Sequence, residues 1–310
     1  MQTLRRWCAT AAACALAVAG WGASSPAQAR EDVAPSADEP ALALRIGQYN
    51  LPGPDKLHRA STRARRAAEL IRRADLDVVA LNELVGTGRH GRGSTASAFA
   101  RQVRTSLGGH WRLVVPTTRR NENYLAYRED RLRVVYQHAD RIVPGIGSGR
   151  HRQQTARHVT PVLLEQRSSH RRVLIAGTHL VSGDRAGARR QARDVGRALA
   201  RIAGGTPVVV AGDMNTSDVL GGLTSIGLAD ARRRAAARTN ADVSTYVRYD
   251  LRRPKRISRQ VIDQVYVPVG WQVASWTTAA DAPRGRFRQP RPSDHLLVWA
   301  SVQGPPEQGD

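Results

Sequence analysis

The chain has 310 residues, of which 41% are hydrophobic and 24% are charged. This composition excludes a disordered or low-complexity chain, and one large α/β domain could use most of the length. The longest apolar run is too short for a transmembrane span, which needs about 20 apolar residues. We therefore expect a monomer without stable insertion into a membrane.

The formal net charge is +22, and it comes almost entirely from arginine, because Lys56 and Lys255 are the only lysines. A charge of this size attracts polyanions such as nucleic acid, anionic lipid and cell-wall polymers. Arginine also matches the geometry of phosphate groups. A second interpretation stays open, since GC-rich coding sequences favour arginine and alanine whatever the function.

The first 29 residues have the pattern of a secretory signal peptide. Arg5 and Arg6 precede a small-residue apolar run, and the cleavage signal Ala27-Gln28-Ala29 follows it. We expect cleavage after Ala29 and a secreted, extracellular protein, and a lipid anchor on Cys14 is the alternative. Cys8 and Cys14 are the only cysteines, so the mature chain has no disulfide.

The rest of the chain divides into a flexible leader at 30–41, one folded domain at 42–303 and a disordered tail at 304–310. Helical spacing of apolar residues predicts helices at 60–74, 97–107 and 185–202. The stretch 216–260 is rich in arginine and has little core pattern. Alternating or short apolar runs predict strands at 42–50, 77–81, 111–116, 123–128, 132–137, 158–166, 171–178, 207–211, 261–267, 271–277 and 293–299.

The core strand at 207–211 leads into the motif Gly212-Asp213-Met214-Asn215. The carboxyl ends of strands are where α/β sheets place their chemistry, and Gly212 lets a ligand approach the backbone there. Asp213 offers a negative oxygen, and Asn215 offers an amide that both donates and accepts. This pair suits a phosphate, its attacking water and a divalent ion, although an Asx turn after a strand has the same residues.

Similar polar groups stand at the boundaries of five other expected strands. A lone buried glutamate or histidine is usually a core residue whose hydrogen bonds are satisfied. Many such groups, each at the end of an apolar strand, indicate one shared site for a metal ion or a phosphate. The other members of this set are Asn50, Glu83, His179, Asp263, Asp294 and His295.

With these motifs the sequence resembles the endonuclease/exonuclease/phosphatase superfamily, and within it a secreted bacterial member of the pancreatic deoxyribonuclease type. The most specific pieces are Gly212-Asp213-Met214-Asn215, Thr178-His179-Leu180 and Ser293-Asp294-His295, and the resemblance covers about 42–302. It implies an α/β fold: a four-layered α/β sandwich of two mixed β-sheets face to face with helices outside. Because the superfamily also includes sphingomyelinases and inositol-phosphate phosphatases, it leaves the substrate open.

The resemblance also implies a site that depends on Mg²⁺ or Mn²⁺, hard ions that prefer oxygen ligands. Glu83 would be the main metal ligand, with Asn50 beside it and Asp294 assisting. Asp213 and Asn215 would orient the attacking water and the scissile phosphate.

Two histidines complete the implied site. His295 would act as a general base or charge stabiliser, held by Asp263 through its other ring nitrogen. His179 would stabilise the phosphorane or protonate the leaving oxygen. Arg157 resembles a phosphate-contacting arginine of deoxyribonuclease-like enzymes.

The sequence departs from the family's pattern at three places near the site. Asn82-Glu83 stands where Gln-Glu is usual, and Tyr49 stands where a tryptophan often precedes the first-strand asparagine. Glu122 is one residue out of register for the carboxylate that supports the catalytic histidine in deoxyribonuclease-like members. The sequence therefore leaves open whether His179 has a carboxylate partner.

The basic segment that leads into Asp263 favours nucleic acid as the substrate. Between residues 248 and 259 Asp250 is the only acid, and we expect Arg252, Arg253 and Arg256 to bind backbone phosphates. The resulting hypothesis is a secreted nuclease that hydrolyses DNA, or else RNA. A solvated basic loop is the plain alternative.

Two competing functions remain at this stage. A phospholipid phosphodiesterase of the sphingomyelinase type needs apolar or aromatic loop tips that enter a bilayer, and only 5% of this chain is aromatic. A basic binding protein on an inactive scaffold would not be expected to keep every catalytic position of the family.

Overall fold

The structure is a computed structural model that describes residues 41–53, 59–84, 97–118, 121–147, 155–218, 220–248, 251–254, 260–288 and 290–306. The expected signal peptide and almost all of the leader lie outside these residues, as does Arg256. The longer helices are α1 (Ala60–Arg73), α2 (Ala98–Leu107) and α4 (Arg185–Ala203). The short ones are α5 (Leu220–Leu223), η1 (Thr224–Ile226), α6 (Ala231–Arg234) and η3 (Pro283–Gly285).

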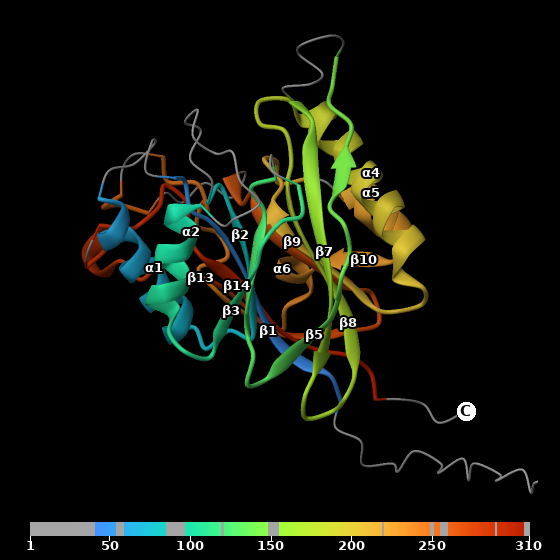
Figure 1. The fold of residues 1–310 in the computed structure, drawn as a ribbon. Coiled ribbons are helices and arrows are strands. Elements are labelled where there is room, and N and C mark those ends of the chain that lie inside the picture. Colours follow the sequence, from blue (N-terminus) through green and yellow to red (C-terminus); the bar gives the residue numbers. More distant parts are fainter. Residues whose placement is uncertain are drawn as a thin grey trace, which may run out of the picture.

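The described strands form two mixed sheets of seven strands each (Figure 1). The first has the order β11 (Ala237–Thr239), β13 (Gln272–Thr278), β14 (Val298–Gln303), β1 (Ala43–Asn50), β2 (Val78–Asn82), β4 (Tyr124–Arg128) and β3 (Trp111–Val114). The second has the order β10 (Leu228–Asp230), β12 (Asp263–Pro268), β9 (Val208–Asp213), β8 (Arg172–His179), β7 (Arg157–Gln166) and β5 (Leu132–Gln137), and β6 (Arg141–Val143) pairs with β7.

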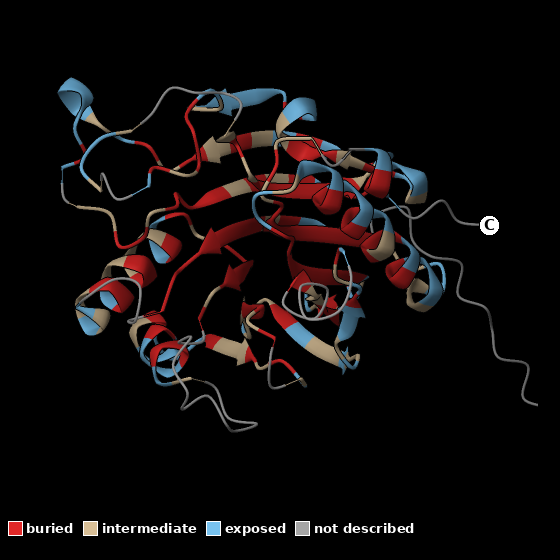
Figure 2. Cartoon of the chain, turned by 90° about the horizontal axis from the view of Figure 1, so that it is seen from above, coloured by how far each residue is buried: buried red, intermediate tan, exposed pale blue. Residues whose placement is uncertain are grey.

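Three apolar clusters show that the sheets and helices form four layers. The inner cluster joins the two sheets through residues such as Ile46 and Val209. A second cluster packs α1 and α2 on the outer face of the first sheet, and a third packs α4 on the outer face of the second. Figure 2 shows buried strands between helices whose outer faces are exposed. The predicted four-layered sandwich is confirmed.

Strand β9 shows why the sequence folds in this way. Val209 and Ala211 face the inner cluster, whereas Val208 and Val210 face α4, so both faces of the strand are apolar. Helix α4 connects β8 to β9, which are parallel neighbours. Such a connection must cross the sheet on one face, and the apolar stripe of α4 covers that face.

Two sequence predictions differ from the structure. The last strand, β14, begins at Val298 and not at residue 293, because the backbone N–H of Leu296 donates to Thr245 O before the ladder with β1 starts. The stretch 216–260 has more core than expected, since Val243 and Val247 pack with Phe287 in a fourth apolar cluster. The short strands β6, β10 and β11 were not predicted.

None of the described helices is long and apolar enough to cross a membrane.

Candidate active site

Strand register brings the predicted polar residues to one edge of the sandwich. His179, Asp213 and Asp263 are register neighbours across β8, β9 and β12. In the facing sheet, Asn50 is paired with Asn82. A Cβ on Gly212 would lie 2.1 Å from Thr178 O, so only glycine lets β8 and β9 approach this closely. The motif therefore has a backbone role as well as a chemical one.

Asp213 lies at the centre of this edge and is 1% exposed. Its Oδ2 accepts a hydrogen bond from Asn50 Nδ2 at 3.0 Å and lies 3.7 Å from Nε2 of both His179 and His295. Its Oδ1 accepts from the backbone N–H of Asn215 at 2.9 Å. Burial raises the pKa of the Asp213 carboxyl, and the two histidines oppose this rise.

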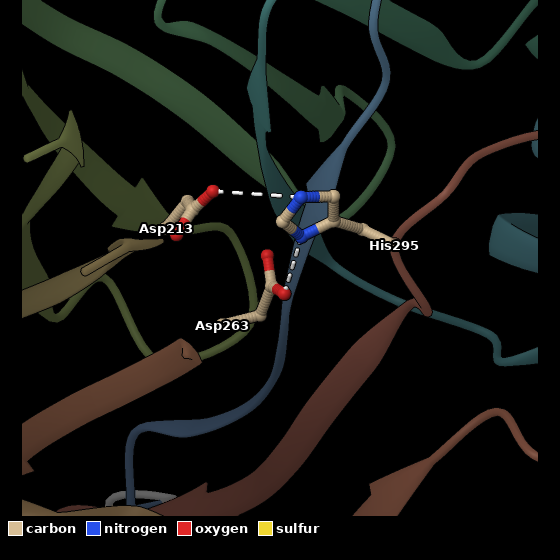
Figure 3. A group of neighbouring side chains, drawn as sticks. All are labelled: Asp213, Asp263 and His295. Carbon is tan, nitrogen blue, oxygen red and sulfur yellow. Dashed lines mark hydrogen bonds and ion pairs between the residues drawn. The ribbon is translucent and has the colours of Figure 1, made fainter. Parts of the chain in front are cut away.

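The inner histidine pair consists of His295 and Asp263 (Figure 3). The ring nitrogen Nδ1 of His295 lies 2.8 Å from Asp263 Oδ2, and Gln48 Nε2 donates to the other oxygen at 3.2 Å. Burial acts to lower the pKa of His295, but the charges of Asp263 and Asp213 outweigh it and raise this pKa to about 10. His295 is therefore an imidazolium at neutral pH, fixed by Asp263.

The outer histidine pair consists of His179 and Glu122, and it settles a point that the sequence left open. Nδ1 of His179 lies 2.7 Å from Glu122 Oε1. Burial acts to lower the pKa of His179, but Glu122 and Asp213 outweigh it and raise this pKa to about 9. Burial also acts to raise the pKa of Glu122, yet the adjacent His179 brings it below its usual value. Glu122 is thus the carboxylate partner of His179, despite its shifted register.

The loop before β4 explains how Glu122 reaches His179. Asn123 is buried, accepts from Asn82 Nδ2 at 2.7 Å and donates to His158 O at 2.9 Å. Asn121 donates to Thr160 Oγ1 at 2.7 Å. These two asparagines fix the loop on both sides of Glu122. The Glu122 side chain therefore lies at the site, within reach of His179.

Asn50 and Glu83 offer hard oxygen donors beside Asp213. Asn50 Nδ2 donates to Glu83 Oε1 at 3.1 Å as well as to Asp213, which orients the amide oxygen Oδ1. That oxygen is buried and has no hydrogen-bond partner among the residues that the structure describes. A buried acceptor of this kind is costly unless something satisfies it, and a cation beside the Glu83 carboxylate would do so. The residues therefore fit a divalent metal ion.

A second donor set lies deeper in the site. Asp213, Asp263 and His295 each place one potential ligand atom within 4.8 Å of the others, and all three are buried. This composition also suits a metal ion. Because Asp263 and His295 are already hydrogen-bonded to each other, a metal bound by all three would have to replace that contact.

The site opens into a cleft of about 790 Å³. Its lining includes the acidic residues Glu83, Glu122 and Asp294 and three arginines from different parts of the chain, Arg157, Arg185 and Arg248. The lining of the cleft thus combines metal-compatible acidic groups with positive charge.

The family is decided by a match over most of the chain. The profile of the Endonuclease/Exonuclease/phosphatase family matches residues 47–295, a span that contains every catalytic and metal-ligand position predicted above. The chain belongs to this family. No relative among the curated proteins matches the sequence.

Solved structures of the endonuclease/exonuclease/phosphatase family have the same fold at low sequence identity. A family protein from Bacteroides thetaiotaomicron has a TM-score of 0.68 and 15% identity, covering 86% of this chain and 99% of the other. A mannosyl-6-phosphatase from the same species has a TM-score of 0.65 and 15% identity, covering 84% and 99%. D. rerio TDP2 in complex with a single-strand DNA product has a TM-score of 0.55 and 16% identity, covering 84% and 98%.

Most of the predicted site residues of this phosphoesterase lie together in the structure. Arg157 lines the cleft, as do Asn215 and Asp294, but Arg252 and Arg253 are exposed and do not belong to its lining. The structure also adds Tyr246, whose ring centroid lies 4.9 Å from that of His295 at a tilt of 44°. Nothing in the local sequence marks Tyr246, because its position depends on an isolated bridge between Tyr246 and His295.

Proposed function

We propose that this family member is a secreted, divalent-metal-dependent phosphodiesterase that hydrolyses nucleic acid. The observation that carries the proposal is the pair of histidines around Asp213. Both Nε2 atoms lie 3.7 Å from Asp213 Oδ2, and each histidine is held through Nδ1 by its own carboxylate. A phosphate group in the cleft would meet two oriented imidazolium groups and one carboxylate.

The raised pKa values define how these residues act. With pKa values of about 9 and 10, His179 and His295 are both protonated at neutral pH. They can therefore stabilise the negative charge that develops on a pentacoordinate phosphorus, and His179 can donate a proton to the leaving oxygen. Asp213, whose pKa is raised by burial, is suited to orient the attacking water and accept its proton.

We assign the metal to Glu83 and Asn50, with Asp294 assisting from the same cleft. When bound, a hard ion such as Mg²⁺ or Mn²⁺ polarises the phosphoryl oxygen and neutralises its charge. The amide oxygen of Asn50, which is buried and has no partner in the described part of the chain, is the ligand atom that most needs such an ion. Asn215 donates to Leu180 O through Nδ2 at 2.9 Å, which fixes its amide beside Asp213.

Nucleic acid is favoured as the substrate by the charge around the cleft. Three arginines line it, and the whole chain carries a formal net charge of +22. Arginine binds phosphate groups in a bidentate manner, so flanking phosphates of a polymer would find partners there. The complex of D. rerio TDP2 with a single-strand DNA product adds support, since that protein has the same fold.

A small phosphomonoester is the second candidate substrate. The mannosyl-6-phosphatase with the same fold favours it. A monoester would need only one phosphate position, whereas three arginines line the cleft, so we rank it below nucleic acid.

The test is hydrolysis by the purified protein in Mg²⁺, with single-stranded DNA, duplex DNA, RNA, a sugar 6-phosphate and sphingomyelin vesicles as parallel substrates. We expect the nucleic acids to be cut, and Asp213→Asn to abolish that activity. Turnover of the sugar phosphate or the lipid without cleavage of any nucleic acid would overturn the proposal. N-terminal sequencing of secreted protein tests the location, and we expect Arg30 as the first residue.

A further inference from the structure

Helix α4 carries an exposed row of arginines that the catalytic site does not use. The helix contains six arginines and one aspartate over 19 residues. Its apolar residues, such as Ala188 and Leu199, face the third cluster, so the arginines occupy the solvent face. Arg190, Arg193, Arg197 and Arg201 follow the spacing i, i+3, i+7 and i+11, which places them in one stripe about 17 Å long.

The helix that carries the stripe begins at the catalytic cleft. Helix α4 joins the parallel strands β8 and β9, so it runs antiparallel to both, away from the edge where His179 and Asp213 lie (Figure 1). Arg185, its first residue, lines the cleft itself. A chain of phosphates that leaves the cleft beside Arg185 can therefore continue along the flank of the molecule on α4.

These arginines are available to a ligand. Arg193 and Arg201 are exposed, and neither has a carboxylate partner among the described residues. Arg190 lies 3.9 Å from Asp184, and Arg197 pairs with Asp194, but the side chains of both arginines are more than half exposed. Exposed pairs of this kind contribute about 0–1 kcal/mol each, so a phosphate can replace the aspartate at little cost.

We infer that the α4 stripe is a track for single-stranded nucleic acid that extends from the catalytic cleft; this inference rests on the proposed function. A single strand can bend from the edge of the sandwich onto its flank. A duplex is much stiffer, with a persistence length of about 150 base pairs, so it follows a bent path over the surface less readily than a single strand does. An anionic membrane fits less well, because the large exposed hydrophobic side chains among the described residues lie elsewhere, at Tyr136, Ile142 and Val269.

The stripe has no aromatic side chain for base stacking, so binding there depends on charge alone. Each phosphate neutralised on a single strand contributes about −0.7 to the slope of log K against log salt concentration. Replacing Arg193, Arg197 and Arg201 by glutamine should then make the slope shallower by about 2 units and weaken binding about 10²-fold or more at low salt, for all sequences alike.

The experiment measures binding of labelled oligonucleotides to the full chain carrying Asp213→Asn, so that no cleavage interferes. The variant Arg193→Gln/Arg197→Gln/Arg201→Gln is compared with Arg65→Gln/Arg73→Gln/Arg104→Gln on α1 and α2. These control arginines are also exposed, and Arg73 has a helical acidic partner, Glu69, just as Arg197 has Asp194.

We expect the α4 variant to lose affinity for a strand of about 30 nucleotides and to bind one of about 6 like the parent, because a short strand fits the cleft alone. Duplex binding should change less than single-strand binding, and the control should match the parent. An unchanged salt slope in the α4 variant would overturn the track. Loss of binding to vesicles of phosphatidylcholine and phosphatidylserine, with single-strand binding intact, would also overturn it. Failure of the wild-type protein to cleave any nucleic acid would instead reject the proposed function, whatever the binding result.

Discussion

The two carboxylate–histidine pairs around Asp213 have the same geometry but different surroundings. In the inner pair, Asp263 is fully buried on β12 and also accepts from Gln48. In the outer pair, the Glu122 side chain is 30% exposed and belongs to a loop. Water screens charges at the outer pair more than at the inner one, so the same contact should stabilise His295⁺ more strongly than His179⁺. The two pairs therefore differ in how deeply the carboxylate is buried and not in the length of the contact.

Removal of the metal should lower the rate of hydrolysis most, because the phosphate on which both histidine pairs act would then lose its metal ion. We expect a chelator to abolish hydrolysis and Mg²⁺ or Mn²⁺ to restore it. The variant Glu83→Gln should need much more metal for half-maximal activity. Glu69→Gln, at a half-exposed glutamate paired with Arg73 on α1, is the control and should behave like the wild type. Full activity in chelator would contradict the metal site.

Removal of the inner carboxylate, Asp263, should cause the next largest loss of turnover. Asp263→Asn keeps the shape of the side chain but removes the charge that holds His295 as an imidazolium, so we expect turnover to fall about 10²-fold or more. The melting temperature should fall by no more than it does in Asp230→Asn, a control for a buried aspartate on β10, outside the cleft lining. Unchanged turnover in Asp263→Asn would show that this residue is only structural.

Removal of the outer carboxylate, Glu122, should lower turnover less than removal of Asp263. Glu122→Gln is expected to lower turnover about tenfold, because solvent already screens the carboxylate that it removes. The alkaline limb of the rate profile should also move to lower pH, since His179 then loses the partner that raises its pKa to about 9. A loss of turnover in Glu122→Gln equal to that in Asp263→Asn would contradict the proposed difference between the two pairs.

Stability should reveal the same difference through its dependence on pH. Both histidines have a folded-state pKa above the ordinary value of about 6.5, so each stabilises the fold fully below that pH. This contribution is lost as pH rises through about 9 for His179 and about 10 for His295. In chelator, the free energy of unfolding should fall as the pH rises from about 6.5 to about 10. The variant His295→Gln should reduce this fall more than His179→Gln. An unfolding free energy that rises over this range would contradict the assigned charges.

The family resemblance predicted the inner pair of Asp263 and His295 from sequence, whereas it left the outer pair open. Strand register accounts for one part of that site, because it sets Asp213 and Asp263 side by side. Glu122 lies in a loop whose shape depends on Asn123 bonding to Asn82, a residue 41 positions away. No local pattern contains that contact, so the sequence left the partner of His179 open.

The remaining differences have similar causes. Leu296 and Leu297 continue the apolar pattern of β14, yet the backbone of Leu296 bonds to Thr245 and not to a neighbouring strand. Val243 and Val247 are isolated apolar residues in an arginine-rich stretch, and their partner Phe287 is far along the chain. Periodicity detects strands and helices, but it does not detect core built from scattered loop residues.

The most direct test of the site is hydrolysis of a small chromogenic phosphodiester by the wild type and by Asp213→Asn, at matched Mg²⁺ and with melting curves for both. This substrate needs neither the arginines of the cleft nor the α4 stripe, so it tests the chemistry alone. We predict metal-dependent turnover in the wild type and a loss of at least about 10²-fold in the variant, with the fold retained. Equal turnover in the two proteins would contradict the central role of Asp213 between the two histidines.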